Sequence, residues 1–209
     1  GIDTDDWDPS SDPALVTPFD AARPELKAAN HDALCDELGL AAGPGPLVVS
    51  VSRFDYQKGI DLLGEAGGIL AGIPVRLALL GSGEWETEAA MARLAEAHPG
   101  RIAFRQGYDA ALAHRMFAAG DLAIIPSRFE PCGLTQMQAM RYGTVPIVSD
   151  VGGLHDTVVD TCCGTGGFLI AAMAALDVHA GNDEAVRQEI REHRLVGVDG
   201  SIPTGADHG

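Results

Sequence analysis

The stretch IIPSRFEPCGLTQMQAM, residues 124–140, joins an apolar run, a polar loop with a carboxylate, and a segment with helical spacing. The apolar run ends at Pro126, and Pro-Cys-Gly comes directly before the expected helix. The first backbone N–H groups of a helix have no partner within the helix, so they favour an anion. In an open α/β sheet, ligands bind beside a junction of this type. We therefore predict a site for a phosphate-bearing ligand, with Glu130 contacting a polar part of it.

The same order of strand, loop and helix repeats along most of the chain. Continuous apolar runs, which predict strands, alternate with segments whose apolar residues recur at helical spacing. Strands that are apolar throughout and alternate with helices favour a parallel sheet covered on both faces. The predicted fold class is therefore α/β, with a Rossmann-like doubly wound parallel sheet. Strands are expected at 47–51, 75–80, 102–105, 122–125, 145–148 and 167–170, and helices at 24–38, 58–70, 84–97, 110–118, 134–141 and 154–159.

Composition divides the chain into three parts. Residues 1–22 are rich in aspartate and proline, so we expect a connecting segment that is ordered against a partner domain through Trp7 and Phe19. The Rossmann-like domain is expected over residues 23–170. Residues 171–209 end without a core-forming pattern, and we predict that this tail is divergent and partly helical or disordered.

The chain is acidic, with 14 Lys and Arg against 30 Asp and Glu and a formal net charge of −16. This charge disfavours nucleic acid and anionic membranes as partners, although solubility alone also explains it. An anionic ligand must then be held by a few local cations and backbone amides. No apolar run is long enough to cross a bilayer, and the four cysteines lack the spacing of a metal site, so we expect no metal.

Polar residues follow several expected strands at what should be one edge of the sheet. Arg53 and Lys58 follow the first strand, Gly81 the second, and Tyr108 the third. The carboxyl ends of parallel strands share one edge, so these loops can converge. Arg53 and Lys58 would then place two cations beside the helix start near Gly133, which suits a diphosphate.

Each of these residues also has a simpler interpretation. Arg53 or Lys58 alone is typical of a solvated surface charge, and Gly81 lies in a Gly-Ser-Gly turn that lacks the full dinucleotide-binding pattern. Tyr108 suits packing as well as stacking on a base. Glu130 can cap the following helix, whose positive end favours a carboxylate. The prediction of a site therefore depends on the placement of these residues at successive strand ends.

The sequence resembles the C-terminal, donor-binding domain of bacterial glycogen synthases and plant starch synthases, which form glycosyltransferase family 5. The segment GIDTDDWDP (1–9) is similar to the one that follows the N-terminal domain in that family. The block SRFEPCGLTQ is highly specific to this group. The matching blocks are SRFDYQKGIDLL (52–63), LALLGSGEWE (77–86), GYDAALAHRMFAAGDLAIIPSRFEPCGLTQMQAMRYGTVPIV (107–148) and GGLHDTV (152–158).

The resemblance implies a GT-B glycosyltransferase, built from two Rossmann-like domains with the donor bound mainly to the C-terminal one. It implies retaining transfer of glucose from ADP-glucose, or UDP-glucose in some members, to the non-reducing end of an α-1,4-glucan. The implied partners are the nucleotide-sugar donor, the glucan acceptor and an N-terminal domain that these residues lack. We therefore expect a fragment that is inactive in isolation, and a transfer reaction that needs no cofactor. The expected location is the cytoplasm, or the plastid if the protein comes from a plant or alga.

By motif position, the resemblance implies catalytic roles for Arg53, Lys58 and Glu130. The two cations would grip the donor diphosphate, and Glu130 would contact the glucose hydroxyls. Negative charge builds on the departing diphosphate in the transition state, so preorganised cations lower the barrier there. The residues implied in substrate binding are Gln57, Gly81, Tyr108, Cys132, Gly133, Leu134 and Thr135.

Two other functions remain open on the sequence. One is a nucleotide-sugar-binding module without transfer activity, and the other is a different GT-B hexosyltransferase. A related glycosyltransferase pattern has a second glutamate where this chain has Gln138, and the glutamine favours the glycogen synthase branch.

Overall fold

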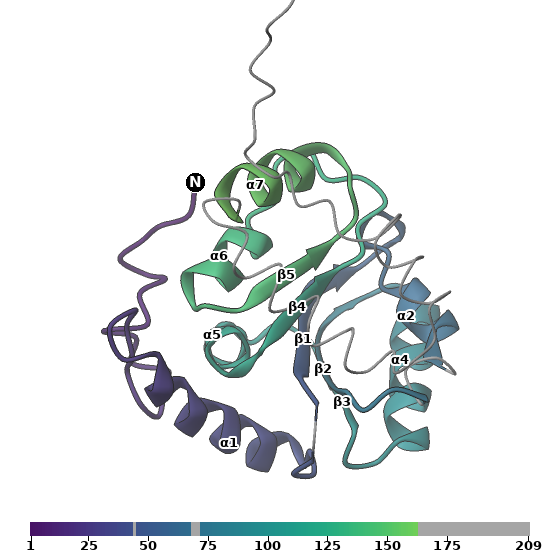
Figure 1. The fold of residues 1–209 in the computed structure, drawn as a ribbon. Coiled ribbons are helices and arrows are strands. Elements are labelled where there is room, and N and C mark those ends of the chain that lie inside the picture. The colour runs from purple at the N-terminus through teal and green to yellow at the C-terminus, as the bar shows by residue number, and fades with distance from the viewer. Residues whose placement is uncertain (44, 68–71, 163–209) are drawn as a thin grey trace, which may run out of the picture. The chain divides into compact units, whose positions relative to one another are not determined.

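Figure 1 shows the fold in the computed structural model, which describes residues 1–43, 45–67 and 72–162. The strand predicted over 167–170 and the tail predicted over 171–209 lie outside the described residues. The elements, in chain order, are η1 (Pro24–Leu26), α1 (Lys27–Leu38), β1 (Leu47–Phe54), η2 (Tyr56–Lys58), α2 (Asp61–Glu65), β2 (Arg76–Gly83), α4 (Trp85–Ala97), β3 (Ile102–Gln106), α5 (Ala110–Ala119), β4 (Leu122–Ile125), α6 (Thr135–Arg141), β5 (Val145–Val148) and α7 (Gly152–Cys162).

The described residues form a five-stranded parallel sheet in the order β3-β2-β1-β4-β5. The chain divides into two compact units, Gly1–His155 and Asp156–Gly209, and the sheet lies in the first. From β1 the chain moves outward to β3, then returns to the other side of β1 for β4 and β5. The strand order therefore reverses between β1 and β4, which is the topological switch point of an open α/β sheet. The predicted Rossmann-like, doubly wound fold class is confirmed.

Helices cover both faces of this sheet, with α1 and α5 on one face and α2 and α4 on the other (Figure 1). Leu47 and Val49 of β1 belong to the core under α1 and α5, which includes Phe117. Val48, between them in the strand, belongs to the second core with Met91 of α4. Successive strand residues point to opposite faces, so a strand buried on both sides requires a continuous apolar run.

Strands β1 and β2 are longer than predicted and stay paired as far as Phe54 and Gly83. Arg53 and Gly81 therefore lie inside strands, and the prediction that they lie in loops after the strands is wrong. A Cβ added to Gly81 would lie 2.0 Å from the carbonyl oxygen of Ser52 on the neighbouring strand. Glycine is needed here for close approach of two strands, a use that sequence alone does not distinguish from a turn.

The helix predicted over 58–70 is interrupted in the structure. Tyr56–Lys58 form η2, and α2 begins at Asp61, with Gly59 between them at a φ of 66°. A Cβ added to Gly59 would lie 2.1 Å from the carbonyl oxygen of Pro126. The left-handed conformation and this close contact with the loop after β4 explain the break. The other described helices begin and end close to the predicted residues.

Trp7 and Phe19, which were expected to contact a partner domain, instead pack against residues of the first unit. Trp7 stacks on His114 of α5, with ring centroids 3.9 Å apart. Phe19 is buried and meets Tyr142 edge-on, with centroids 6.4 Å apart. These rings bring the N-terminal segment into the core on the α5 side of the sheet.

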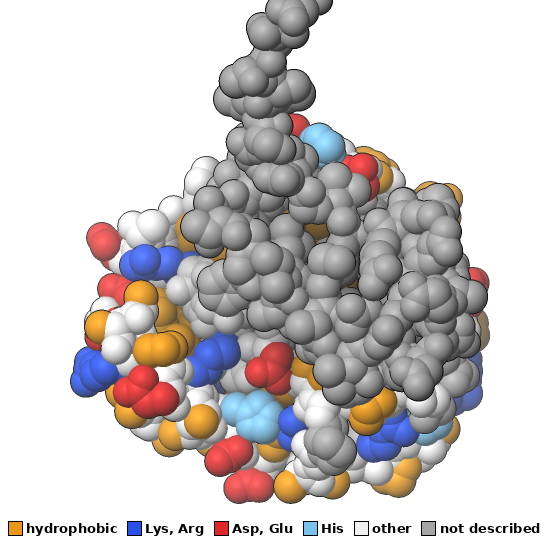
Figure 2. Space-filling model, in the orientation of Figure 1, with side chains coloured by type: hydrophobic (Ala, Val, Ile, Leu, Met, Phe, Trp, Pro, Cys, Tyr) orange, Lys and Arg blue, Asp and Glu red, His pale blue; other side chains and the backbone are white. Residues whose placement is uncertain are grey.

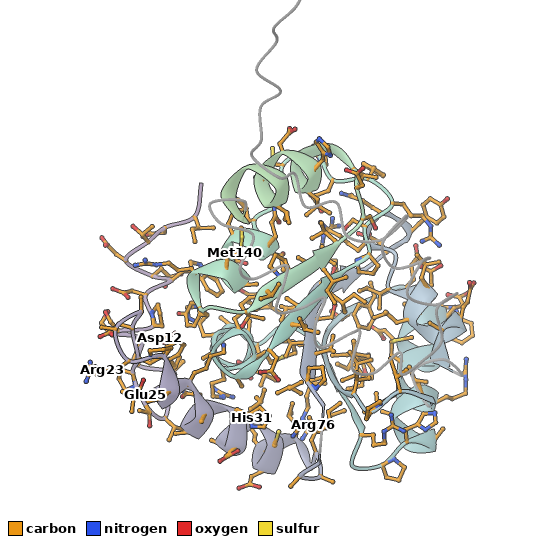
Figure 3. All side chains as sticks on the ribbon, viewed as in Figure 1. Asp12, Arg23, Glu25, His31, Arg76 and Met140 are labelled. Carbon is orange, nitrogen blue, oxygen red and sulfur yellow. The ribbon has the colours of Figure 1, made fainter. Side chains whose placement is uncertain are left out.

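Asp12 (labelled in Figure 3) lies at the same place and joins the segment to α5 and to the end of α6. Its Oδ2 accepts a hydrogen bond of 2.5 Å from the Tyr142 hydroxyl and lies 2.8 Å from His114 Nδ1. Burial, and then the bond to Asp12, raises the pKa of Tyr142. The hydroxyl therefore stays protonated and donates a hydrogen bond to Asp12. We call Trp7, Asp12, His114 and Tyr142 the anchor cluster.

The face shown in Figure 2 carries acidic and basic side chains interspersed, wherever its side chains are coloured by type. On the described part of that face, no continuous basic surface of the kind that binds nucleic acid is seen. Within residues 1–43, 45–67 and 72–162, no helix combines the length and the apolarity that crossing a membrane requires.

Candidate functional site

The carboxyl ends of β1 and β4 flank the switch point of the sheet. Ligands of open α/β sheets bind outside the strand ends at such a point. We call residues 53–61, at the end of β1, and residues 126–133, after β4, the switch-point edge. A small pocket there is lined by residues of both strands and by Lys58, Pro126 and Thr135.

Lys58 and Glu130 form an ion pair across this edge, between Nζ and Oε2. Their side chains are only 19% and 9% exposed, so the pair is partly shielded from water, where attraction between charges is stronger than at an open surface. The Ser127 hydroxyl lies 3.5 Å from the same carboxylate oxygen. Lys58 and Glu130 were both predicted as catalytic, and the structure brings them together although 72 residues separate them.

Asp55 fixes the segment that carries both predicted cations. Its Oδ1 accepts a hydrogen bond of 3.0 Å from the Lys58 backbone N–H and so caps η2. Its Oδ2 lies 2.8 Å from Arg53 Nη1. The Arg53 side chain is 69% exposed, so this guanidinium stands in solvent at the end of β1. Asp55 was not predicted as a site residue, although an aspartate three residues before Lys58 is a local signal for a side-chain cap.

Glu130 is held by contacts other than the helix cap considered as its alternative role. Helix α6 has Leu134 at its N-cap and no side-chain cap bond. The Gln136 amide instead turns back and donates to the Gly133 carbonyl at 3.0 Å. The Glu130 carbonyl accepts a bond of 2.7 Å from Gly153 at the start of α7. The helix-cap interpretation of Glu130 is therefore wrong.

The other residues predicted to bind substrate lie along the carboxyl edge of the sheet at different depths. Tyr108 is 88% exposed and leaves its ring in solvent. The contacts within the described residues do not test whether each one binds a ligand, so their roles stay predictions. Cys132 and Leu134 are exposed, Gln57 and Thr135 are half-buried, and Gly81 and Gly133 are buried.

Arg128 and Asp61 were not predicted as site residues. The Arg128 guanidinium binds both Asp61 carboxylate oxygens, at 2.8 and 2.7 Å, and lies 4.3 Å from the centre of the Tyr56 ring. The bonds from Arg128 lower the pKa of Asp61, and those from Asp61 raise the pKa of Arg128. The two residues are 67 positions apart, so no local spacing could have paired them.

Exposed rings occur at further strand ends on this edge. Tyr56 follows β1 and is 66% exposed, Trp85 follows β2 and is 71% exposed, and Phe129 follows β4 and is 55% exposed. Large rings in water at neighbouring strand ends indicate a contact surface, because such side chains otherwise belong in a core. These three rings were not predicted as site residues, whereas the exposed ring of Tyr108, which follows β3, was.

Known proteins are similar to this chain over most of its length. The sequence model of the family described as "Glycosyl transferases group 1" matches residues 39–196. The glycogen synthase of Methylocella silvestris is 52% identical over 161 residues, which are 77% of this chain and 33% of that protein. The glycogen synthase of Novosphingobium aromaticivorans is 51% identical over 160 residues, with the same two shares. The chain thus spans about a third of the length of these curated relatives.

A solved structure shares both the fold and part of the sequence. It is the catalytic domain of Starch Synthase IV from Arabidopsis thaliana, bound to ADP and acarbose. The two proteins are 35% identical and superpose with a TM-score of 0.74 over 90% of this chain and 42% of that one.

Proposed function

Since this chain belongs to the glycosyl transferases group 1 family, we propose that it is the donor-binding half of a glycogen or starch synthase. The proposed reaction is retaining transfer of glucose from ADP-glucose, or UDP-glucose, to the non-reducing end of an α-1,4-glucan. The chain spans about a third of the length of the glycogen synthases that it matches. Turnover is therefore proposed to require an N-terminal domain that supplies the acceptor side of the cleft.

The observation that carries this proposal is the Lys58–Glu130 ion pair at the switch point, with Arg53 on the same strand end. A nucleotide sugar has an anionic diphosphate next to a ring of hydroxyls. A lysine can bind a phosphate as a point charge, and an arginine can bind it through two parallel bonds. A carboxylate accepts hydrogen bonds from hydroxyls. One cation and one carboxylate in contact therefore suit the junction between the diphosphate and the sugar.

In the proposed mechanism, Arg53 and Lys58 act on the leaving group. As the bond between glucose and ADP breaks, negative charge grows on the diphosphate, and cations already in place stabilise that charge. Glu130 orients the sugar through its hydroxyls, beside Lys58 at the sugar end of the phosphates. The backbone around Cys132 and Thr135 is proposed to contact the phosphate and sugar, and Tyr108 the base.

The base of the donor is proposed to be adenine, because the similar Arabidopsis domain is described as bound to ADP. The proposal needs no cofactor, since protein cations meet the growing charge. It also keeps the cytoplasm as the expected compartment. The second candidate function is a nucleotide-sugar-binding module without transfer activity. It is supported by the fact that the chain spans only about a third of the length of its curated relatives.

Calorimetric titration with ADP and ADP-glucose tests the donor site. The chain should bind both ligands, and Arg53→Ala and Lys58→Ala should each remove most of that affinity. Arg23→Ala is the matched control, because Arg23 (labelled in Figure 3) is exposed and pairs with a nearby aspartate, Asp20, at 3.0 Å. Equal affinities in all four proteins would overturn the proposed site.

An elongation assay with ADP-glucose and glycogen separates the two candidates. The isolated chain should not extend glycogen, whereas the chain joined to the N-terminal domain of a related glycogen synthase should. Turnover by the isolated chain would show that the N-terminal domain is dispensable. Donor binding without turnover in the joined protein would favour the binding module.

A further inference from the structure

Arg128 connects the two halves of the switch-point edge. Its guanidinium binds both carboxylate oxygens of Asp61, at the start of α2, and Nη1 also donates to the Tyr56 carbonyl at 3.0 Å. Its backbone N–H donates to the Gln57 carbonyl at 2.8 Å. One residue of the loop after β4 therefore holds the segment after β1 on both sides of Lys58.

The ion pair that the site depends on lies between these contacts. Lys58 is next to Gln57 in η2, and Glu130 is two residues after Arg128. Gly59 fits directly against the Pro126 carbonyl, so the two segments have little room to shift without separating. A displacement of the Arg128 contacts would consequently move the Lys58 ammonium relative to the Glu130 carboxylate.

The Arg128–Asp61 pair contributes more to geometry than to folding stability. Its side chains are 24% and 39% exposed, and ion pairs this open to water contribute little to folding stability. A guanidinium that binds a carboxylate through two parallel bonds nevertheless fixes the distance and the orientation of both groups. Small misplacements of a catalytic group lower its effect strongly. The consequence of losing Arg128 should therefore appear in ligand binding more than in stability.

We propose that Arg128 is a positioning residue, whose pairing with Asp61 holds Lys58 against Glu130 at the place where its ammonium meets the diphosphate of a nucleotide. This inference rests on the proposed function, since it concerns the donor site. Arg128 acts through Lys58 and needs no contact with the ligand itself. Asp61 acts in the same way from the other side of the pair.

A comparison of ADP with AMP distinguishes positioning from general damage. In Arg128→Met and in Asp61→Asn, the affinity for ADP measured by calorimetry should fall about tenfold, because a displaced ammonium loses its phosphate contact. The affinity for AMP should fall much less, so the ratio of ADP to AMP affinity decreases. A purely structural role would weaken both nucleotides alike and leave that ratio unchanged.

Double variants test the route of the effect. In a Lys58→Ala background, measured at millimolar ADP, Arg128→Met should cause no further loss, because residues that act as a unit are not additive. The exchange of both charges, Asp61→Arg with Arg128→Asp, should restore part of the ADP affinity. If Arg128→Met does not fold, Asp61→Asn carries the same comparison.

The matched control is Arg115→Met. Arg115 binds both oxygens of Glu37, at 3.0 and 2.8 Å, with side chains 25% and 41% exposed, and it lies on α5. This variant should keep the affinities for ADP and AMP. If the unmodified chain does not bind ADP, the proposed function and this inference both fail. If Lys58→Ala weakens ADP binding but Arg128→Met does not, only the positioning role of Arg128 fails.

Discussion

The chain has two lysines, Lys27 and Lys58, and they lie in two regions that treat a positive charge differently. Lys27 lies beside the anchor cluster, and its ammonium donates to three oxygens of the protein, the Phe117 and Tyr142 carbonyls and the Thr144 hydroxyl, at 2.9 to 3.0 Å. Within the part of the chain that the structure describes, the ammonium of Lys58 at the switch-point edge bonds to one side chain, the Glu130 carboxylate, beside a pocket. An ammonium has three protons to donate, so Lys27 is fully used by the fold while Lys58 has capacity for a ligand.

The same contrast holds for the residues around the two lysines. In the anchor cluster, Asp12, His114 and Tyr142 are at most 9% exposed and bond to one another. At the switch-point edge, Arg53 is 69% exposed and Tyr108 is 88% exposed. Buried polar groups stabilise a fold only when they are paired, whereas exposed groups at a strand end can exchange water for a ligand. We therefore expect changes to the buried side chains of the anchor cluster to alter stability, and changes to the exposed side chains of the switch-point edge to alter binding.

The largest effect is expected from Asp12→Ala. It removes the buried carboxylate that the Tyr142 hydroxyl and His114 share and leaves these two groups, 3.2 Å apart, only each other, which should lower the free energy of unfolding by about 4 kcal/mol. Urea denaturation followed by circular dichroism measures this change. The affinity for ADP of the molecules that remain folded should not change.

Asp5→Ala is the control for this prediction, because Asp5 is an exposed aspartate of the same segment. Its effect should stay within about 0.5 kcal/mol, as for most surface substitutions. Equal free energies of unfolding for Asp12→Ala and Asp5→Ala would contradict the proposed difference between the regions, since the anchor cluster would then stabilise the fold no more than the surface does.

The fold was predictable because its strands are continuous apolar runs, and those of β1 and β2 begin with residues buried on both faces. The bounds predicted for β4 and β5 from such runs agree with the structure. The ends of β1 and β2 were not predictable. Gly81 and Gly83 resemble a turn in sequence, and only the neighbouring strand shows that they allow close backbone contact.

The site was predictable as far as topology decides it. Parallel strands put their carboxyl ends on one edge, which placed Lys58 and Glu130 at the same edge without any contact being known. The pairing of Arg128 with Asp61, and the docking of Trp7 on α5, depend on residues that are distant in sequence. No spacing rule connects such residues, so sequence patterns alone missed both.

The next largest effect is expected from Gly59→Ala, which tests how tightly the switch-point edge is built. The new Cβ would need a left-handed conformation and would meet the Pro126 carbonyl oxygen at 2.1 Å, so the free energy of unfolding should fall by about 3 kcal/mol. Gly39→Ala is the matched control, with a φ of 69° and no atom within 4 Å of the added Cβ. It should cost about 1 kcal/mol, for backbone strain alone.

Both glycine variants are measured by urea denaturation, and ADP affinity is measured beside it. Gly59→Ala should also weaken ADP binding, because the clash separates the two segments that hold Lys58. Equal destabilisation by Gly59→Ala and Gly39→Ala would mean that the Pro126 contact relaxes easily, and that the switch-point edge is looser than the anchor cluster.

A smaller effect is expected from the titration of Lys27. Burial lowers its pKa from 10.5 to about 8, against the attraction of Asp121. Between pH 8 and 10.5, the unfolded chain therefore keeps a proton that the folded chain has lost. The unfolded state binds more protons in this window, so the contribution of Lys27 to stability rises with pH, by on the order of 2 kcal/mol.

The measurement compares the free energy of unfolding of the wild type with that of Lys27→Met between pH 7.5 and 10. The difference, wild type minus variant, should increase with pH, since only the wild type titrates at this position. The raised pKa of Tyr142 opposes the trend near the top of the range, but it is present in both proteins and cancels. A difference that is constant with pH would show that Lys27 is as well solvated as an exposed lysine.

The smallest change in stability, and the most specific change in binding, is expected from Glu130→Gln. The glutamine amide oxygen can still accept a hydrogen bond from the Lys58 ammonium, so the loss of the ionic attraction should lower the free energy of unfolding by only about 1 kcal/mol. ADP should bind a few-fold more tightly, because its phosphates no longer compete with the carboxylate for Lys58. The affinity for ADP-glucose should fall relative to that for ADP, because the sugar hydroxyls lose a charged acceptor.

Glu37→Gln, which breaks the exposed pair with Arg115, is the control and should leave both affinities unchanged. The ratio of ADP-glucose to ADP affinity, measured by calorimetry on the two variants and the wild type, decides the role of Glu130. A Glu130→Gln variant that binds ADP about tenfold more weakly but keeps that ratio would make Glu130 a support for Lys58. The switch-point edge would then resemble the anchor cluster, with its carboxylate serving the fold rather than the sugar.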